Sequence, residues 1–138
     1  MARVTPFLLF DGDCAKAMQF YATCFGGELL LTQLGETPMR VQFPEAMHGK
    51  VTYAHLKAGL VEISGTDWLH PVRRPVVGNT VAVLVASEDA EELRAVFGRL
   101  AEGAREEFFV GLMEMPFGLY GRFTDRFGVE WFFRGGVG

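Results

Sequence analysis

His55 and Glu62 are the two side chains in this sequence whose types and spacing best suit chemistry. They flank Ala58-Gly59 in the segment VTYAHLKAGLVEISG, which is typical of two strands joined by a tight turn. If Ala58 and Gly59 are the two turn residues, His55 lies directly opposite Glu62 on the same face of the sheet, with Cβ atoms about 5 Å apart. Such a pair is half of a metal site, a general acid–base pair or a cross-strand ion pair, and all three readings stay open.

A second polar group surrounds Glu130 in the segment FGVEWFF. Strand alternation places Glu130 with Phe132 on one face of a sheet and Trp131 with Phe133 on the other. Arg122, on the strand before, either neutralises Glu130 or binds an anionic substrate. The pair therefore belongs either to a binding site or to ordinary strand surface.

Aromatic and methionine side chains supply a candidate lining for a small-molecule pocket. Methionine adapts its shape to irregular apolar surfaces, although the same residue types also build plain core. The candidate pocket residues, with the arginine included, are Tyr53, Met113, Met115, Phe117, Tyr120, Arg122 and Trp131.

An internal repeat predicts the elements that must position these residues. Each half of the chain reads as a strand, a helix, a strand and a glycine-closed hairpin, in the pattern that helical and strand periodicity produce. We expect two βαβββ modules, residues 4–66 and 79–134, in a single domain spanning 1–138. Each module needs its copy to complete a core.

The boundaries of several elements can be predicted as well. Asp13 is the expected N-cap of the first helix, and Ser87 that of a second helix from Glu88 onward. A strand is expected over residues 106–114. The proline- and glycine-containing segment 35–50 is expected to be an irregular, mobile loop.

Composition limits the class of protein. The chain has 138 residues, 49% of them hydrophobic, a net charge of −4 and a pI of about 5.4. This balance argues against nucleic acid as a partner. No apolar run reaches the roughly 20 residues of a membrane span, and the N-terminus reads as a strand and not as a signal peptide. We therefore expect a cytoplasmic protein that does not bind membranes.

The two cysteines fit a reducing compartment. Cys14 and Cys24 both fall on the first predicted helix, about 15 Å apart at a rise of 1.5 Å per residue. A disulfide requires Cα atoms within about 7 Å, so the two thiols are expected to be free. A position near a helix start can lower the pKa of a thiol, but no histidine is close to Cys14 in the sequence to act as its base. Both cysteines are therefore expected to serve as small hydrophobic residues of the helix.

Three segments carry a resemblance to a known family: FLLFDGDCAKAMQFYATCFGGEL, GKVTYAHLKAG and GRFTDRFGVEWFF. Together they resemble the PhnB-like branch of the vicinal oxygen chelate superfamily, which includes glyoxalase, bleomycin resistance and extradiol dioxygenase proteins. The resemblance covers roughly residues 4 to 134. It implies an α+β fold of two βαβββ modules that form a cupped mixed sheet, with one helix packed outside each, and a homodimer.

The resemblance also implies where a metal would be held. Active members bind one divalent ion, such as Mn, Ni, Zn or Fe, through His, Glu or Gln on the inner sheet faces, and here the candidates are His55, Glu62 and Glu130. Glu62 in LVEISG matches a ligand position of the superfamily, whereas Glu130 stands two residues before one. The first strands of both modules, 6–10 and 81–85, are wholly apolar and offer no ligand. The metal site is therefore expected to be degenerate.

Three hypotheses for function follow. The first is a PhnB-like protein that binds a small apolar or aromatic molecule in the cup of the sheet. The second is a metal-dependent lyase or dioxygenase of the glyoxalase type, and the third is a dimeric resistance protein that sequesters a compound without turnover. Some relatives carry a ubiquinone-pathway methyltransferase name. That activity is not expected, because Gly26-Gly27 follows a helix and no strand–GxGxxG–helix motif is present.

Overall fold

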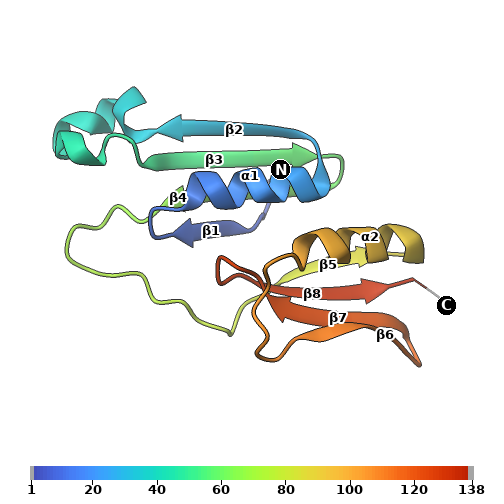
Figure 1. Cartoon of the computed structure of the whole chain (residues 1–138). Coiled ribbons are helices and arrows are strands. Elements are labelled where there is room, and N and C mark those ends of the chain that lie inside the picture. Colours follow the sequence, from blue (N-terminus) through green and yellow to red (C-terminus); the bar gives the residue numbers. More distant parts are fainter. Residues whose placement is uncertain (1, 137–138) are drawn as a thin grey trace. The chain divides into compact units, whose positions relative to one another are not determined.

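The computed structural model describes residues 2–136, which form two compact units that divide between Val76 and Val77 (Figure 1). The first unit contains β1 (Phe7–Phe10), α1 (Cys14–Phe25), β2 (Glu28–Gln33), β3 (Val51–Ala58), β4 (Val61–Asp67) and three short 3-10 helices, η1 (Leu34–Glu36), η2 (Pro38–Gln42) and η3 (Glu45–Met47). The second unit contains β5 (Val83–Ser87), α2 (Ala90–Leu100), β6 (Val110–Met115), β7 (Gly118–Thr124) and β8 (Glu130–Gly135).

Both units have the same topology. The strand orders are β1-β4-β3-β2 and β5-β8-β7-β6. In each unit the first strand pairs in parallel with the last, and the remaining pairs are antiparallel. The two βαβββ modules that the repeat predicts are therefore confirmed, each as a four-stranded mixed sheet with one helix.

Helix α1 covers one face of the first sheet through a stripe at helical spacing. Its buried residues recur three or four positions apart, as an amphipathic helix requires, and they are Cys14, Ala17, Met18, Tyr21 and Cys24. Both cysteines are free and buried, in agreement with the prediction that no disulfide joins them.

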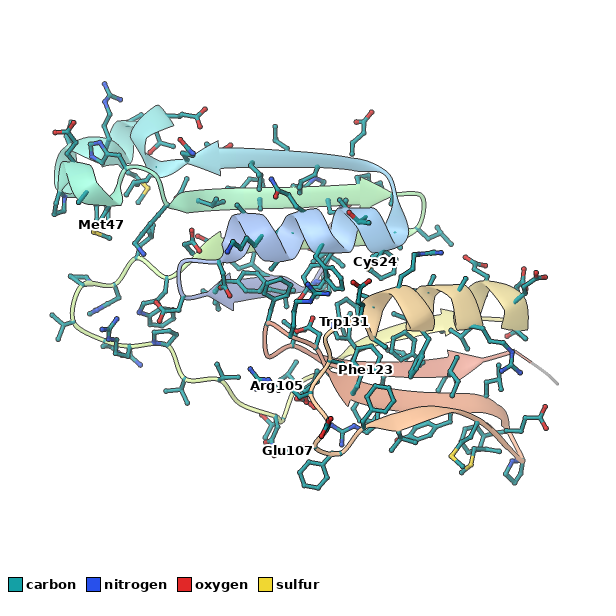
Figure 2. The ribbon with its side chains drawn as sticks, viewed as in Figure 1. Cys24, Met47, Arg105, Glu107, Phe123 and Trp131 are labelled. Carbon is teal, nitrogen blue, oxygen red and sulfur yellow. The ribbon has the colours of Figure 1, made fainter. Side chains whose placement is uncertain are left out.

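The second core is an aromatic cluster between α2 and its sheet. Phe97 of α2 meets Phe133 and Phe123 edge-on, with ring centroids 4.8 and 5.1 Å apart, which is a favoured geometry for aromatic pairs. Figure 2 shows Phe123 and Trp131 on the side of the sheet that α2 covers. The opposite, helix-free face is left for the polar residues of β7 and β8.

The first helix begins after the predicted N-cap residue, Asp13, whereas the start of the second helix needs correction. Asp13 stands at the N-cap position of α1 but makes no side-chain capping bond; instead, the Asp67 Oδ1 atom accepts the backbone N–H of Cys14 at 3.0 Å. The second helix begins at Ala90, and its N-cap is Asp89, whose side chain accepts the next free N–H groups. Ser87 lies two residues before this N-cap and is still paired in β5.

The β3–β4 turn is displaced by one residue from its predicted position. Gly59 and Leu60 form the turn, and Lys57 lies opposite Glu62, while His55 lies opposite Ser64. Gly59 has a φ of +61° and Leu60 does not take a positive φ. A two-residue hairpin with glycine first and a positive φ only there is the type II′ arrangement.

The segment before β3 is folded into the three short 3-10 helices and is not an open loop. The backbone N–H of Gly35 donates to the carbonyl of His48 at 2.9 Å. His48 Nε2 lies 2.9 Å from the carbonyl oxygen of Arg40 and 3.2 Å from that of Phe43. These contacts within the segment hold it in a folded conformation.

Strand β6 starts at Val110, so the predicted strand over residues 106–114 begins too early. The preceding segment turns, and its Phe108 has a φ of +56°. Within residues 2–136, no helix combines the length and the apolar character needed to cross a membrane.

Candidate functional site

In the first unit, Glu62 is surrounded by basic groups on the helix-free face of the sheet. Its Oε2 atom lies 2.8 Å from Arg3 Nη1, 3.7 Å from Lys57 Nζ and 3.8 Å from His55 Nε2. The Glu62 side chain is only 11% exposed. His55 and Glu62 therefore do lie together, although they are diagonal neighbours and not directly opposed.

These neighbours make Glu62 a poor ligand for a divalent cation. Arg3 and Lys57 place two permanent positive charges within 4 Å of the same carboxylate oxygen, and both repel a metal ion at that position. His55 and Glu62 belong to the first unit and Glu130 to the second. No group of three or more His, Cys, Asp or Glu side chains is arranged to hold a metal in the described part of the chain.

In the second unit, Glu130 is held by both of its oxygens. Oε1 lies 2.6 Å from Arg122 Nη2, and Oε2 accepts a short hydrogen bond from the Thr124 hydroxyl. These contacts follow from the register, since Thr124 lies opposite Glu130 and Arg122 lies opposite Phe132. The Arg122 guanidinium also lies over the Phe132 ring, 5.1 Å from its centroid.

A cavity of about 500 Å³ opens above this ion pair. Its floor is the helix-free face of β7 and β8, and its walls come from two loops, residues 77–79 and 105–108. The lining residues are Val77, Gly78, Asn79, Arg105, Glu107, Phe108, Arg122, Thr124, Gly128, Glu130 and Phe132. Figure 2 shows Arg105 and Glu107 on the loop that precedes β6.

Only one of the predicted pocket residues lines this cavity, namely Arg122. Met113 and Tyr120 are paired across β6 and β7 and lie farther along the same face, whereas Tyr53 belongs to the first unit. Trp131 requires correction: its side chain has no exposed surface, and its indole N–H donates to Asp125 Oδ2 at 2.8 Å. It is a core residue on the face that α2 covers.

Two arginines of the cavity lining carry side-chain donors without a partner among the described residues. Arg122 Nε is buried and has no hydrogen-bond partner among the described residues. A buried donor left unsatisfied costs about 1–3 kcal/mol, and more when it is charged. The Arg105 backbone N–H donates to the carbonyl of Thr124 at 2.9 Å, while no described residue pairs with its guanidinium.

Phe108 is the lining residue that sequence reasoning missed most completely. It is 78% exposed and takes the left-handed backbone conformation that bulky residues rarely adopt. The run EEFFV reads as a strand, and nothing in the residue types signals a turn. Arg105 lies just before this run, and its residue type alone gave no signal that it lines a cavity.

The surroundings of the Cys14 thiol disfavour its reactive thiolate form. Burial, followed by the nearby charges of Asp67 and Asp13, raises its pKa from 9.0 to about 12. A thiol with such a pKa carries almost no nucleophilic thiolate at neutral pH. Its place at a helix start therefore does not lower its pKa.

The fold is that of the glyoxalase/bleomycin resistance proteins. The bleomycin resistance determinant encoded on transposon Tn5 has the same fold, with a TM-score of 0.57, 14% identity, and coverage of 99% of this chain and 98% of that one. A Bacillus cereus structure described as a putative 3-demethylubiquinone-9 3-methyltransferase, PhnB protein, is more similar. It has a TM-score of 0.70 and 24% identity, over 96% of this chain and 98% of that chain.

The family itself follows from the sequence match. The family model described as 3-demethylubiquinone-9 3-methyltransferase matches residues 2–133, so the chain belongs to this family. Protein YjdN of Escherichia coli (strain K12) is 26% identical over 140 residues, which cover 93% of this chain and 91% of YjdN. Protein PA1353 from Pseudomonas aeruginosa is 26% identical, with a TM-score of 0.85 and all of both chains covered. The resemblance to the PhnB-like branch is thereby confirmed.

Proposed function

We propose that this chain is a small-molecule-binding member of its family, which holds an aromatic ligand in the cavity of the second unit without a catalytic metal. The observation that carries this proposal is the cavity of about 500 Å³, where Phe108 and Phe132 stand beside the Arg122–Glu130 pair. Ligand sites of about 300–1,000 Å³ typically combine apolar walls with a few placed polar groups.

The aromatic walls favour a flat ligand. Phe132 presents its ring from β8 on the helix-free face, and Phe108 presents its ring from the loop. Aromatic rings bind other aromatic rings in stacked or edge-on contacts that exceed the effect of area alone. The ion pair fixes the orientation of the polar groups, because both Glu130 oxygens are engaged.

The metal-dependent lyase or dioxygenase is the less favoured hypothesis. Each candidate carboxylate ligand is within 3 Å of an arginine, Glu62 of Arg3 and Glu130 of Arg122. A divalent metal at either carboxylate would lie beside the positive charge of an arginine, which repels it. The same cavity also suits the third hypothesis, in which the protein sequesters a compound without turnover. The homodimer and the cytoplasmic location remain predictions.

The family description names a methyl transfer, which we do not propose for this chain. A nucleotide-binding glycine loop runs from a strand into the start of a helix. Here Gly26 and Gly27 lie after the end of α1, and Gly27 lies against the Lys57 backbone, with no room for a side chain. These glycines serve the chain reversal into β2.

Amide chemical shifts of the ¹⁵N-labelled full chain test the proposal directly. One- and two-ring aromatic compounds are titrated, and S-adenosylmethionine is titrated as the methyl-donor alternative. We expect saturable shifts at Thr124, Gly128 and Phe132 with an aromatic compound, no shifts at the Gly59–Leu60 turn, and recovery of the compound unchanged. Saturable binding of S-adenosylmethionine, or the lack of any aromatic ligand at these amides, would overturn the proposal.

A further inference from the structure

The polar groups of the cavity carry an inference about the charge of its ligand, which rests on the proposed function. Four titratable residues line the cavity: Arg105, Glu107, Arg122 and Glu130. Their formal charges cancel, but their hydrogen-bonding capacity does not. What matters is which donors and acceptors remain for a ligand.

Glu130 has little acceptor capacity left for a ligand. One oxygen faces Arg122 Nη2 and the other accepts from Thr124, and the side chain is only 8% exposed. Because both oxygens are held from the strand opposite, the carboxylate cannot turn toward Arg122 Nε without losing a contact. The Nε–H donor therefore stays buried and unpartnered among the residues the structure describes.

Arg105 is a second donor in the same cavity. Its backbone is anchored by the hydrogen bond to Thr124, so the base of the side chain is fixed relative to β7. Gly128 leaves the space beside the guanidinium open: a Cβ there would lie 3.3 Å from Arg105 Nη2. A guanidinium group forms charge-assisted hydrogen bonds with a carboxylate, and these are stronger than its hydrogen bonds to a neutral polar group.

Phe108 supplies the third observation. Its positive φ is the only one among non-glycine residues in the described chain, and its ring remains 78% exposed at the cavity. A bulky residue held in this conformation lowers stability, and such residues concentrate at ligand sites. Because the ring is not buried in the core, core packing does not offset the strain of its backbone. Its position in the cavity wall is the feature that suggests a binding role.

We infer that the cavity binds a planar aromatic carboxylate, whose anionic group meets the Arg105 guanidinium and whose ring stacks on Phe108. Arg122 Nε is buried, so Arg105 makes the direct contact and Arg122 contributes positive charge beside it. Arg105 adds the charge that selects a carboxylate over a neutral group. Glu107 also lines the cavity but is exposed to solvent. Its negative charge is therefore screened and does not require a positively charged ligand.

The matched probes are 2-naphthoate and 2-naphthamide, which share a ring system and differ in charge. Dissociation constants are measured by calorimetry on the full chain at low and high salt. We expect naphthoate to bind about tenfold more tightly or better, the scale of one good charged contact. Its advantage should shrink with salt, because salt screens an exposed charge such as that of Arg105.

Arg105→Gln is the variant of choice, because Arg105 makes no side-chain contact on which the fold depends. It should weaken naphthoate about tenfold and leave naphthamide unchanged. Arg94→Gln, on the exposed face of α2, is the matched control and should change neither ligand. Equal binding of acid and amide by the native chain would overturn the carboxylate inference while the proposed function stands. Failure of every aromatic compound would overturn both.

Phe108→Gly separates a binding role from a structural one. Glycine adopts a positive φ without strain, so this variant should unfold at the same or a higher denaturant concentration. It should nevertheless bind naphthoate several-fold more weakly than the native chain, and Phe108→Ala should do the same without the gain in stability. Unchanged naphthoate affinity in both variants would remove Phe108 from the site.

Discussion

The Asp67 carboxylate at the end of β4 accepts the backbone N–H of Cys14, the first residue of α1, at 3.0 Å. Its other oxygen accepts the N–H of Val51, the first residue of β3, at 2.8 Å. One buried side chain thus joins the starts of two elements that are far apart in sequence. It also places a negative charge at the positive end of α1, where such a charge is stabilising.

Asp67→Ala should therefore destabilise the protein far more than Asp13→Ala. Removing Asp67 leaves two buried N–H donors unsatisfied, at about 1–3 kcal/mol each, so we expect a loss of about 2–5 kcal/mol in urea unfolding. Asp13 makes no capping bond, and its replacement should cost less than about 0.5 kcal/mol. Similar losses in the two variants would show that Asp67 does not hold the helix start.

The raised pKa of Cys14 predicts a loss of stability at alkaline pH. In the folded state the thiol keeps its proton up to about pH 12, whereas the unfolded thiol ionises near 9.0. The unfolded state therefore binds fewer protons between these values, and the free energy of unfolding falls as pH rises through this range. The stabilising contribution of the protonated Cys14 thiol is fully present below pH 9.0.

Urea unfolding of the native chain and of Cys14→Ala, at about pH 8 and about pH 10.5, isolates this effect from other titrating groups. The native chain should lose more stability between the two conditions than the variant does. Its buried thiols should also resist iodoacetamide until urea is added. An identical pH dependence in both proteins would contradict the prediction.

Gly26 and Gly27 provide a matched pair for a steric prediction. Both have positive φ, +79° and +87°, but a Cβ on Gly26 meets open space, whereas one on Gly27 would lie 2.2 Å from the carbonyl oxygen of Lys57. Gly26→Ala should cost about 1–3 kcal/mol from backbone strain alone. Gly27→Ala should cost more, because β3 must move as well, and equal unfolding midpoints for the two variants would refute this.

The basic surroundings of Glu62 predict that the protein does not hold a stoichiometric divalent metal. Elemental mass spectrometry is applied to the untagged protein as isolated and after dialysis against Mn, Ni, Zn or Fe(II). We expect no saturable binding, and no difference between the native chain and the His55→Ala and Glu62→Gln variants. About one metal per subunit, lost in both variants, would restore the metal-dependent enzyme.

Much of the fold follows from periodicity, since the apolar positions of each element repeat with the period of the structure they form. The β3–β4 turn shows both the reach and the limit of this reasoning. The position of Gly59 within a two-residue turn cannot be read from residue types, because glycine suits either central position. Moving the turn by one residue changes each cross-strand partner by two, which preserves the face. His55 and Glu62 therefore stay neighbours although the register was wrong.

The sequence predicted only the part of the candidate site that lies on regular strands, where side chains alternate between the two faces of the sheet. The Arg122–Glu130 contact follows from two regular strands. Phe108 and Arg105 lie in a turn whose conformation tertiary contacts decide, and a pair of adjacent phenylalanines favours a strand on propensity alone. The start of α1 was predicted correctly, but the side chain that accepts its first N–H group was not, because it is Asp67, 53 residues away.

The parallel pairing of the first strand with the last, β1 with β4 and β5 with β8, has a consequence for the origin of the chain. A unit whose opening and closing strands are hydrogen-bonded to each other is complete as a sheet before any second copy is added. Tandem duplication of its gene then requires only a connector, here the stretch between β4 and β5, and breaks no existing strand pair. Two copies joined in this way are free to differ in detail: one surrounds Glu62 with basic groups, and the other has a cavity beside Glu130.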